Sequence, residues 1–163
     1  MADTLYFTRH GETFWNVENK ICGATDIALT PRGHAQAEAL GRMLAAQDLP
    51  VDLILSSPLS RALDTARHIA AATGWPLQVE ERLREQNFGR FEGTPRDGAD
   101  FKAAKACFAG RFGGGESMLQ LLARLQFFRR LRQCSGFLCC FSLRFQCKRL
   151  NTFGTFPHHQ INL

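Results

Sequence analysis

Residues 4–16 read Thr-Leu-Tyr-Phe-Thr-Arg-His-Gly-Glu-Thr-Phe-Trp-Asn, and this segment indicates the architecture of the chain. Its first part, residues 4–8, is short and rich in apolar and β-favouring side chains, which predicts a buried strand. Arg9 and His10 follow this strand at once. Because ligands bind outside the carboxyl ends of the strands in open α/β sheets, we expect both residues to lie at a ligand-binding edge.

The chain beyond this stretch alternates short apolar segments with amphipathic ones. This pattern is typical of an α/β domain with a mostly parallel sheet. Further strands are predicted at residues 51–55 and 77–79. The segment after residue 87, up to about residue 98, contains Gly, Asp and Pro and is predicted to be a loop.

Three helices are predicted from their end signals. The first follows Thr30-Pro31, residue types that suit the N-cap and N1 positions, and runs to about residue 47. The second opens at Ser56-Ser57-Pro58 and stops at Gly74. Ser117 and Gln120 fit a capping box for a third helix, over residues 118–132.

Length and composition suit one globular domain. The 163 residues are 45% hydrophobic and 21% charged, which excludes a disordered or fibrous chain. The start of the sequence lacks the basic region and cleavage site of a secretory signal. An uncharged apolar late segment, residues 133–143, is far shorter than the roughly 20 residues of a membrane helix. We therefore expect a cytoplasmic protein with no membrane partner.

His10 is a candidate nucleophile. A neutral imidazole can attack phosphorus through one nitrogen when an acceptor holds the N–H of the other, and an ordinary pKa near 6.5 keeps histidine largely neutral at pH 7. Arg9 would offer a phosphate a bidentate fork, and Gly11 would let the backbone pass close to it. The alternative interpretation is a surface histidine at the end of a strand.

Arg61 and Glu85 are two further candidates. Arg61 lies one turn into the helix that follows the second strand, where a helix N-terminus offers N–H groups and a positive dipole end to an anion. Glu85 precedes an aromatic and glycine-containing segment that could desolvate it, and a carboxyl with a raised pKa can protonate a leaving oxygen. Each alone could be a solvated surface charge. Two arginines and a histidine at the ends of adjacent strands favour a site.

These motifs, taken in order, resemble the histidine phosphatase superfamily, also called phosphoglycerate mutase-like. The family fingerprint, Arg-His-Gly-Glu followed by Trp-Asn, stands at residues 9–16. Later pieces match in order and spacing, namely Gly23-Ala24-Thr25-Asp26, Ser56-Ser57-Pro58 with Arg61 and Thr65, Leu83 with Glu85, Phe88-Gly89 with Glu92-Gly93, and Gly115-Glu116-Ser117. The resemblance covers residues 5–132.

The resemblance implies a three-layer α/β sandwich, phosphoglycerate mutase-like, with a mostly parallel sheet. It implies that His10 takes the phosphoryl group, that Glu85 is the acid and base, and that the substrate is bound by Arg9, Asn16, Gly23 and Arg61. The implied ligand is a small phosphorylated metabolite, with no metal and no cofactor. The segment at residues 83–93 resembles the phosphatase branch, so phosphomonoester hydrolysis is favoured. Mutase-type phosphoryl transfer and a non-catalytic phosphate-binding remnant are the alternatives.

The C-terminal fifth departs from the family pattern. Members of the family carry a second histidine, followed by glycine, at the end of a later β-branched strand, and this histidine completes the phosphate pocket. No His-Gly pair follows His10 here, and the late histidines, His158 and His159, follow Phe156-Pro157 with no pattern typical of a strand. The loss of this second histidine predicts an impaired enzyme.

Composition also changes abruptly near the third helix. Residues 1–117 hold 13 basic and all 15 acidic residues, net −2, whereas residues 118–163 hold 7 basic residues, net +7. We predict a truncated histidine phosphatase-like domain at residues 1–132, incomplete at its C-terminus, and an aberrant basic, Cys- and Phe-rich tail at residues 133–163 that contains no clean strand or helix pattern.

The origin of the tail has three interpretations. A shifted reading frame would produce such a change in composition. The second interpretation is a metal site. Its possible ligands would be Cys134, Cys139, Cys140, Cys147, His158 and His159, but these residues lack the paired spacing that is typical of zinc ligands. A nucleic-acid-binding tail would need a folded platform that the pattern does not indicate, so no nucleic-acid partner is expected.

Overall fold

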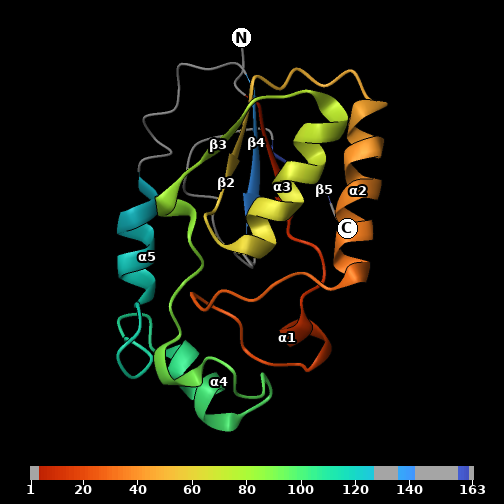
Figure 1. Ribbon diagram of the computed structural model, residues 1–163. Coiled ribbons are helices and arrows are strands. Elements are labelled where there is room, and N and C mark those ends of the chain that lie inside the picture. The colour runs from red at the N-terminus through yellow and green to blue at the C-terminus, as the bar shows by residue number, and fades with distance from the viewer. Residues whose placement is uncertain (1–3, 127–135, 142–157, 162–163) are drawn as a thin grey trace.

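The computed structural model describes residues 4–126, 136–141 and 158–161 (Figure 1). Within these residues one parallel sheet has the strand order β3-β2-β4-β1-β5. Its strands are β1 (Thr4–Arg9), β2 (Leu53–Ser56), β3 (Leu77–Val79), β4 (Gly136–Phe141) and β5 (His158–Ile161). The predicted α/β class with a mostly parallel sheet is confirmed.

Most of the predicted helices begin in the structure at or near the capping residues that the sequence indicates. The described helices are α1 (Phe14–Val17), α2 (Pro31–Ala45), α3 (Ser60–Thr73), α4 (Ala99–Ala106) and α5 (Met118–Leu125), with 3₁₀ turns η1 (Glu81–Leu83) and η2 (Gly89–Phe91). Thr30 caps α2 by accepting the N–H of Gly33, and the predicted capping box of Ser117 and Gln120 starts α5. The predicted continuation of α5 beyond residue 126 lies outside the described residues.

Helices α1 and α4 lie where the sequence predicts none. Helix α1 is a single turn held by a capping box between Thr13 and Asn16. Helix α4 buries only Phe101. Because one buried residue does not produce a periodic apolar face, the pattern that identifies longer helices is absent from α4.

Strand β4 corrects the expectation that residues 133–163 hold no strand. It lies between β1 and β2, and its register places Phe141 beside Arg9 and Cys140 beside Ser56. Parallel strands inside a sheet are buried on both faces, so they read as continuous apolar runs and not as alternation. The sequence Gly-Phe-Leu-Cys-Cys-Phe at residues 136–141 is such a run.

Strand β5 lies in the same part of the chain, at the edge of the sheet. Its residues His158–Ile161 pair with residues 5–8 of β1. The possible metal ligands Cys134 and Cys147 lie outside the described residues. The division into a domain at residues 1–132 and a separate tail remains a prediction.

The main core lies between the sheet and two helices. Helices α2 and α3 pack side by side on one face of the sheet (Figure 1). The buried side chains that meet there are Tyr6, Leu40, Leu44, Ile54, Ala66 and Ile69. This packing fixes the positions of the β1 and β2 ends and of the start of α3.

Leu44 and Met43 are neighbours on α2 that lie in opposite environments. Alanine variants of the two residues therefore test the position of this core. Leu44 is fully buried, whereas Met43 is 42% exposed. We expect Leu44→Ala to lower the free energy of unfolding by about 2–5 kcal/mol because it leaves a cavity. Met43→Ala should change it by about 0.5 kcal/mol or less. Urea denaturation of both variants measures this difference, and equal losses would contradict the core.

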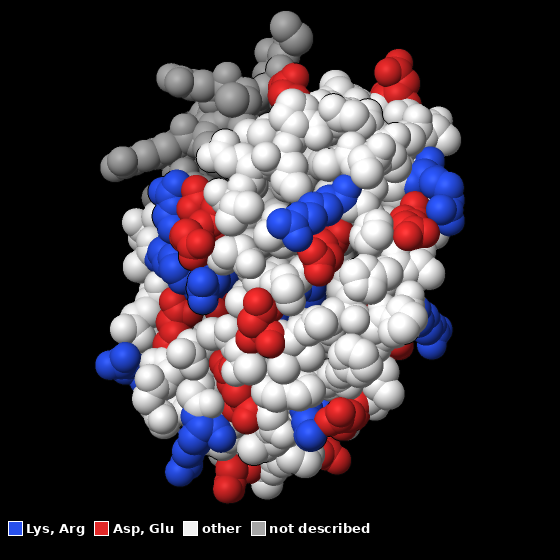
Figure 2. Space-filling model, viewed as in Figure 1, with Lys and Arg blue, Asp and Glu red and all other residues white. Residues whose placement is uncertain are grey.

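The described surface carries both signs of charge. Acidic and basic side chains are interspersed over the face in Figure 2, and they lie close together where α5 is seen in Figure 1. There the Arg124 guanidinium pairs with the Glu116 carboxylate at 2.7 Å. None of the helices in the described part of the chain combines the length and the apolar character needed to cross a bilayer.

Candidate active site

The candidate site lies at the carboxyl ends of the strands. His10 directly follows β1, and Arg61 is the second residue of α3, which follows β2. Below this edge in Figure 1 lies the part of the molecule that contains α1 and α4. A second apolar cluster stabilises that part, built from Ile21, Phe91, Phe101 and Phe112. The edge is therefore enclosed, and His10 and Glu85 are each only 7% exposed.

The tautomer of His10 is fixed by its neighbour. The Nδ1 atom lies 2.6 Å from the carbonyl oxygen of Gly11. A carbonyl oxygen only accepts hydrogen bonds, so Nδ1 carries the hydrogen and Nε2 keeps its lone pair. Burial lowers the pKa of His10 from its ordinary value of 6.5 to about 3, and the charges of Arg61 and Arg9 act in the same direction. His10 is thus neutral, with an unprotonated Nε2, across the physiological pH range.

Arg61 is fully buried and organises the loop that follows α1. Its guanidinium donates hydrogen bonds to the carbonyl oxygen of Gly23 at 2.6 Å and to that of Thr25 at 2.9 Å. Gly23 is tightly enclosed, because a Cβ atom at that position would overlap the side chain of Glu92 and the carbonyl of Gln86. The structure therefore places Gly23 against Arg61, and its predicted contact with substrate remains a prediction.

Glu92 holds the same loop from the other side. Its carboxylate accepts the backbone N–H groups of Ala24 at 2.9 Å, Thr25 at 2.7 Å and Phe88 at 2.9 Å, and also the hydroxyl of Thr25. The sequence pattern singles out Glu92-Gly93 without assigning it a role. Only the folded chain brings residue 92 to the loop at residues 23–25. No pattern in the neighbouring sequence could therefore have identified these hydrogen bonds.

The start of α3 differs from the expectation of an open anion site. The helix begins at Ser60, not at the Ser56-Ser57-Pro58 segment, because Leu59 still has an extended backbone. The N–H and the hydroxyl of Ser60 both donate to the Asp26 carboxylate at 2.8 Å. The anion that this helix end binds is therefore the protein's own Asp26.

Packing against α2 requires glycine at position 11, whether or not a phosphate approaches the backbone there. A Cβ atom on Gly11 would overlap the backbone of Gly33 in α2, and one on Gly33 would overlap the backbone of Glu12. The N–H of Gly11 donates to the hydroxyl of Thr65 at 3.1 Å, and that hydroxyl donates to the carbonyl of Arg61 at 2.8 Å. Helices α2 and α3 together thus hold the residue next to His10.

Glu85 is a buried carboxyl whose protonation is balanced near neutrality. Burial raises its pKa from 4.5 to about 7, although the N–H of Gln86 and the charges of Arg61 and Arg9 oppose the rise. Its Oε1 accepts the N–H of Gln86 at 2.9 Å. An open cleft of about 380 Å³ adjoins Glu85, and its lining includes Ala24, Arg84, Asn87, Arg111, Gly115 and Arg124.

Arg124 fixes the segment that carries Glu85. It donates to the Glu116 carboxylate at 2.9 and 2.7 Å, and to the carbonyls of Arg82 and Arg84 at 2.5 and 2.8 Å. Helix α5 is thereby tied to the residues that directly precede Glu85. The sequence pattern assigns no role to Arg124, because this contact joins segments 40 residues apart.

Four of the predicted site residues share one electrostatic environment. The charges of Arg9 and Arg61 act on both His10 and Glu85. Asn16 is engaged elsewhere, since its side-chain oxygen accepts the N–H and the hydroxyl of Thr13 at 2.9 Å.

Arg96 is an additional cation that the sequence pattern does not identify. Its charge also lowers the pKa of His10, and its Nε–H donates to the carbonyl of Lys20 at 2.7 Å. A neutral nucleophile, a protonatable carboxyl and several arginines can together support transfer of a phosphoryl group.

Comparison with known proteins identifies a matching family and relatives that are similar in sequence. The family model described as histidine phosphatase superfamily (branch 1) matches residues 5–134. A 2,3-bisphosphoglycerate-dependent phosphoglycerate mutase of Mesorhizobium japonicum is 39% identical over 102 residues, which are 61% of this chain and 50% of that protein. One from Brucella ovis is 39% identical over 105 residues, 63% of this chain and 51% of the relative. The chain thus spans about half the length of these curated relatives.

Solved structures agree in fold. Bacillus stearothermophilus YhfR is 31% identical with a TM-score of 0.71, over 86% of this chain and 74% of that one. A mycobacterial glucosyl-3-phosphoglycerate phosphatase, in complex with VO3, is 27% identical with a TM-score of 0.71, over 83% of this chain and 72% of that one.

Proposed function

Because the chain belongs to the histidine phosphatase superfamily, we propose that it is a phosphomonoester hydrolase that acts through a phosphohistidine at His10. The observation that carries this proposal is the hydrogen bond between Nδ1 of His10 and the carbonyl of Gly11, which leaves Nε2 free to attack. The name of the mycobacterial neighbour, a phosphatase in complex with VO3, supports hydrolysis. The substrate class is a small phosphorylated metabolite.

In the first step Nε2 of His10 attacks the phosphorus atom. An N–P bond forms as the bond between phosphorus and the ester oxygen breaks. Protonated Glu85 gives its proton to the leaving oxygen, so that a neutral alcohol departs. A pKa of about 7 makes this proton available below neutral pH.

In the second step water attacks the phosphohistidine. Ionised Glu85 accepts a proton from the water, the N–P bond breaks, and inorganic phosphate and neutral His10 are released. Arg9 and Arg61 stabilise the charge that develops on the phosphoryl oxygens in both steps, and Asn16 is the remaining proposed ligand of these oxygens. Gly23 acts by holding Arg61.

Mutase-type transfer is the second candidate, and it is favoured by the names of the relatives at 39% identity. The two reactions share the first step and differ in what removes the phosphoryl group.

One experiment separates the two reactions. The chain is given phosphoglycerate with 2,3-bisphosphoglycerate, and the release of inorganic phosphate is compared with the isomerisation of phosphoglycerate. Release without isomerisation supports the hydrolase. Binding of vanadate without either reaction would indicate a non-catalytic remnant.

Glu85→Gln should change the pH profile as well as the rate. Above about pH 7 Glu85 loses its proton, so kcat/KM of the parent should fall about tenfold per pH unit. The variant cannot titrate, so this limb should disappear. With an alkyl phosphate its rate at pH 6 should be about 10²-fold below the parent. With 4-nitrophenyl phosphate, whose leaving group needs little protonation, the loss should be smaller.

The matched control is Glu18→Gln, which removes an exposed carboxylate that pairs with Lys20 and not with the reacting groups. This variant should keep the alkaline limb of the parent. If Glu85→Gln retains that limb instead, Glu85 is not the acid.

A further inference from the structure

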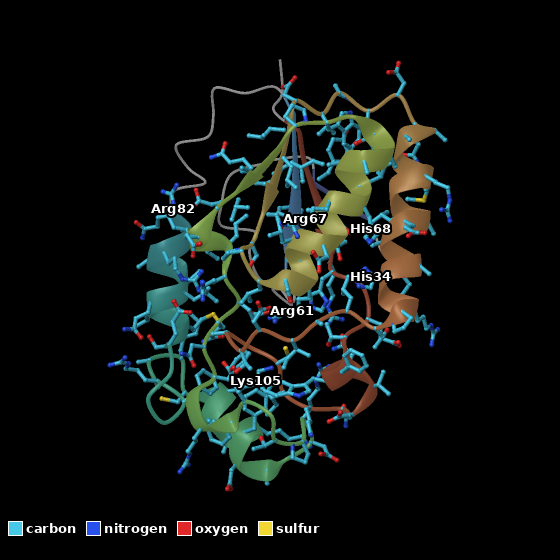
Figure 3. All side chains as sticks on the ribbon, viewed as in Figure 1. His34, Arg61, Arg67, His68, Arg82 and Lys105 are labelled. Carbon is cyan, nitrogen blue, oxygen red and sulfur yellow. The ribbon has the colours of Figure 1, made fainter. Side chains whose placement is uncertain are left out.

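Two histidine side chains outside the proposed site are in contact between neighbouring helices α2 and α3. His34 lies in the first turn of α2 and His68 lies in α3, and their side chains meet between the two helices (Figure 3). Nδ1 of His34 is 3.0 Å from Nε2 of His68, and the ring centroids are 5.3 Å apart. The His68 side chain is 27% exposed and His34 is also half-buried, so solvent reaches the pair.

We propose that His34 and His68 form a binding site for a divalent transition-metal ion, such as Zn²⁺ or Ni²⁺, which links α2 to α3. Two imidazole nitrogens bound to one tetrahedral ion, each about 2.0–2.1 Å from it, lie about 3.3 Å apart. The observed separation of 3.0 Å differs from that value by only a few tenths of an ångström. Small rotations of the two rings therefore place both lone pairs on one ion, and imidazole is a suitable ligand for these metals.

The surrounding carboxylate supports the required tautomers. Oε1 of Glu38 lies 3.8 Å from Nδ1 of His68, which favours the hydrogen on that nitrogen and leaves the lone pair of Nε2 directed at His34. His34 then needs only to carry its own hydrogen on Nε2 to offer Nδ1 to the metal. A carboxylate behind a metal-bound imidazole is a common arrangement that fixes the ring and raises its basicity.

The site differs in kind from a structural zinc centre. In the part of the chain that the structure describes, no group of three or more His, Cys, Asp or Glu side chains is placed to hold a metal. Two imidazoles would leave the other positions to water, so the affinity would be well below that of a four-ligand site. Arg42 lies 3.9 Å from Glu38 and offsets part of its charge.

Binding of an ion would stabilise the helices that support the candidate active site. Gly33, directly before His34, contacts Gly11, and the helix that carries His68 begins beside Arg61. An ion that binds only the native pair shifts the unfolding equilibrium by mass action. The consequence is measurable as stability and does not depend on the proposed hydrolase activity.

Titration of the full chain with Ni²⁺ tests the proposal. Isothermal titration should show one more bound ion in the parent than in His34→Gln or His68→Gln, or binding at that site at least tenfold weaker in each variant. The rise in Tm caused by Ni²⁺ should be smaller in both variants. Cysteines and histidines elsewhere, including His158 and His159, are unchanged in all three proteins and contribute equally.

Arg67→Gln is the matched control, since Arg67 is the exposed neighbour of His68 on α3. It should bind the additional ion as the parent does. Urea unfolding without metal establishes that the two histidine variants are folded. Identical isotherms for the parent and both histidine variants would overturn the proposal, as would equal loss of binding in Arg67→Gln.

Discussion

Replacing His10 with Gln is expected to lower kcat for phosphate ester hydrolysis by about 10⁴-fold or more, because a nucleophile that forms a covalent intermediate has no substitute in the site. Gln keeps similar size and a donor for the Gly11 carbonyl, but the lone pair of its amide nitrogen is delocalised into the carbonyl group and does not attack phosphorus. The parent, mixed rapidly with radiolabelled substrate, should carry acid-labile label on His10. The variant should carry none.

His34→Gln is the control for this experiment, since His34 lies on α2 outside the proposed site. It should retain the activity and the label of the parent. The Arg9 and Arg61 side chains remain in the His10 variant, so inorganic phosphate should still bind to it. Label recovered on a serine or a cysteine would contradict the assignment of His10.

A second histidine placed directly after β4 is expected to raise kcat by about 10²–10³-fold. A transferring phosphoryl group spreads negative charge over its oxygens, and one missing preorganised donor typically costs about that factor. The register pairs Phe141 with Arg9, and position 142 follows Phe141 in the sequence as His10 follows Arg9. The variant is Ser142→His with Leu143→Gly, which creates the His-Gly pair of the family.

The parallel variant Ser142→Gln with Leu143→Gly separates the new imidazole from the change of backbone. It should leave kcat near that of the parent. Vanadate binding, measured for all three proteins, should already be present in the parent and tighten with the new histidine. If the parent already hydrolyses phosphate esters at about 10 s⁻¹, a typical enzyme rate, no group is missing and the proposed impairment is wrong.

The elements with local signals could be predicted from the sequence. Thr30 and Pro31 place the start of α2, and Gly74, at a φ of 75°, ends α3 where a left-handed cap was required. Each depends on hydrogen bonds or steric limits within a few residues, so the residue types alone identify it. The same holds for the position of His10 at the end of β1.

The supports of the candidate site could not be predicted in this way. Glu92 contacts a loop 67 and 68 residues away, and Arg124 contacts carbonyls 40 and 42 residues away. Which carboxylate or guanidinium reaches which loop depends on the packed chain, because any of the charged residues has the required chemistry. Strand β4 was missed for a related reason, since its apolar run becomes a strand between β1 and β2.

The family, the α/β class and the identity of the residues proposed to react follow from the amino-acid sequence, because they depend on residue types at fixed spacing after a strand. The chemical state of these residues depends on the folded chain. Burial of His10 and Glu85 moves their pKa values in opposite directions, to about 3 and about 7, which suits one as a nucleophile and the other as an acid. Desolvation disfavours the charged form of each group, the cation of histidine and the anion of glutamate, and it arises only when distant segments close around them.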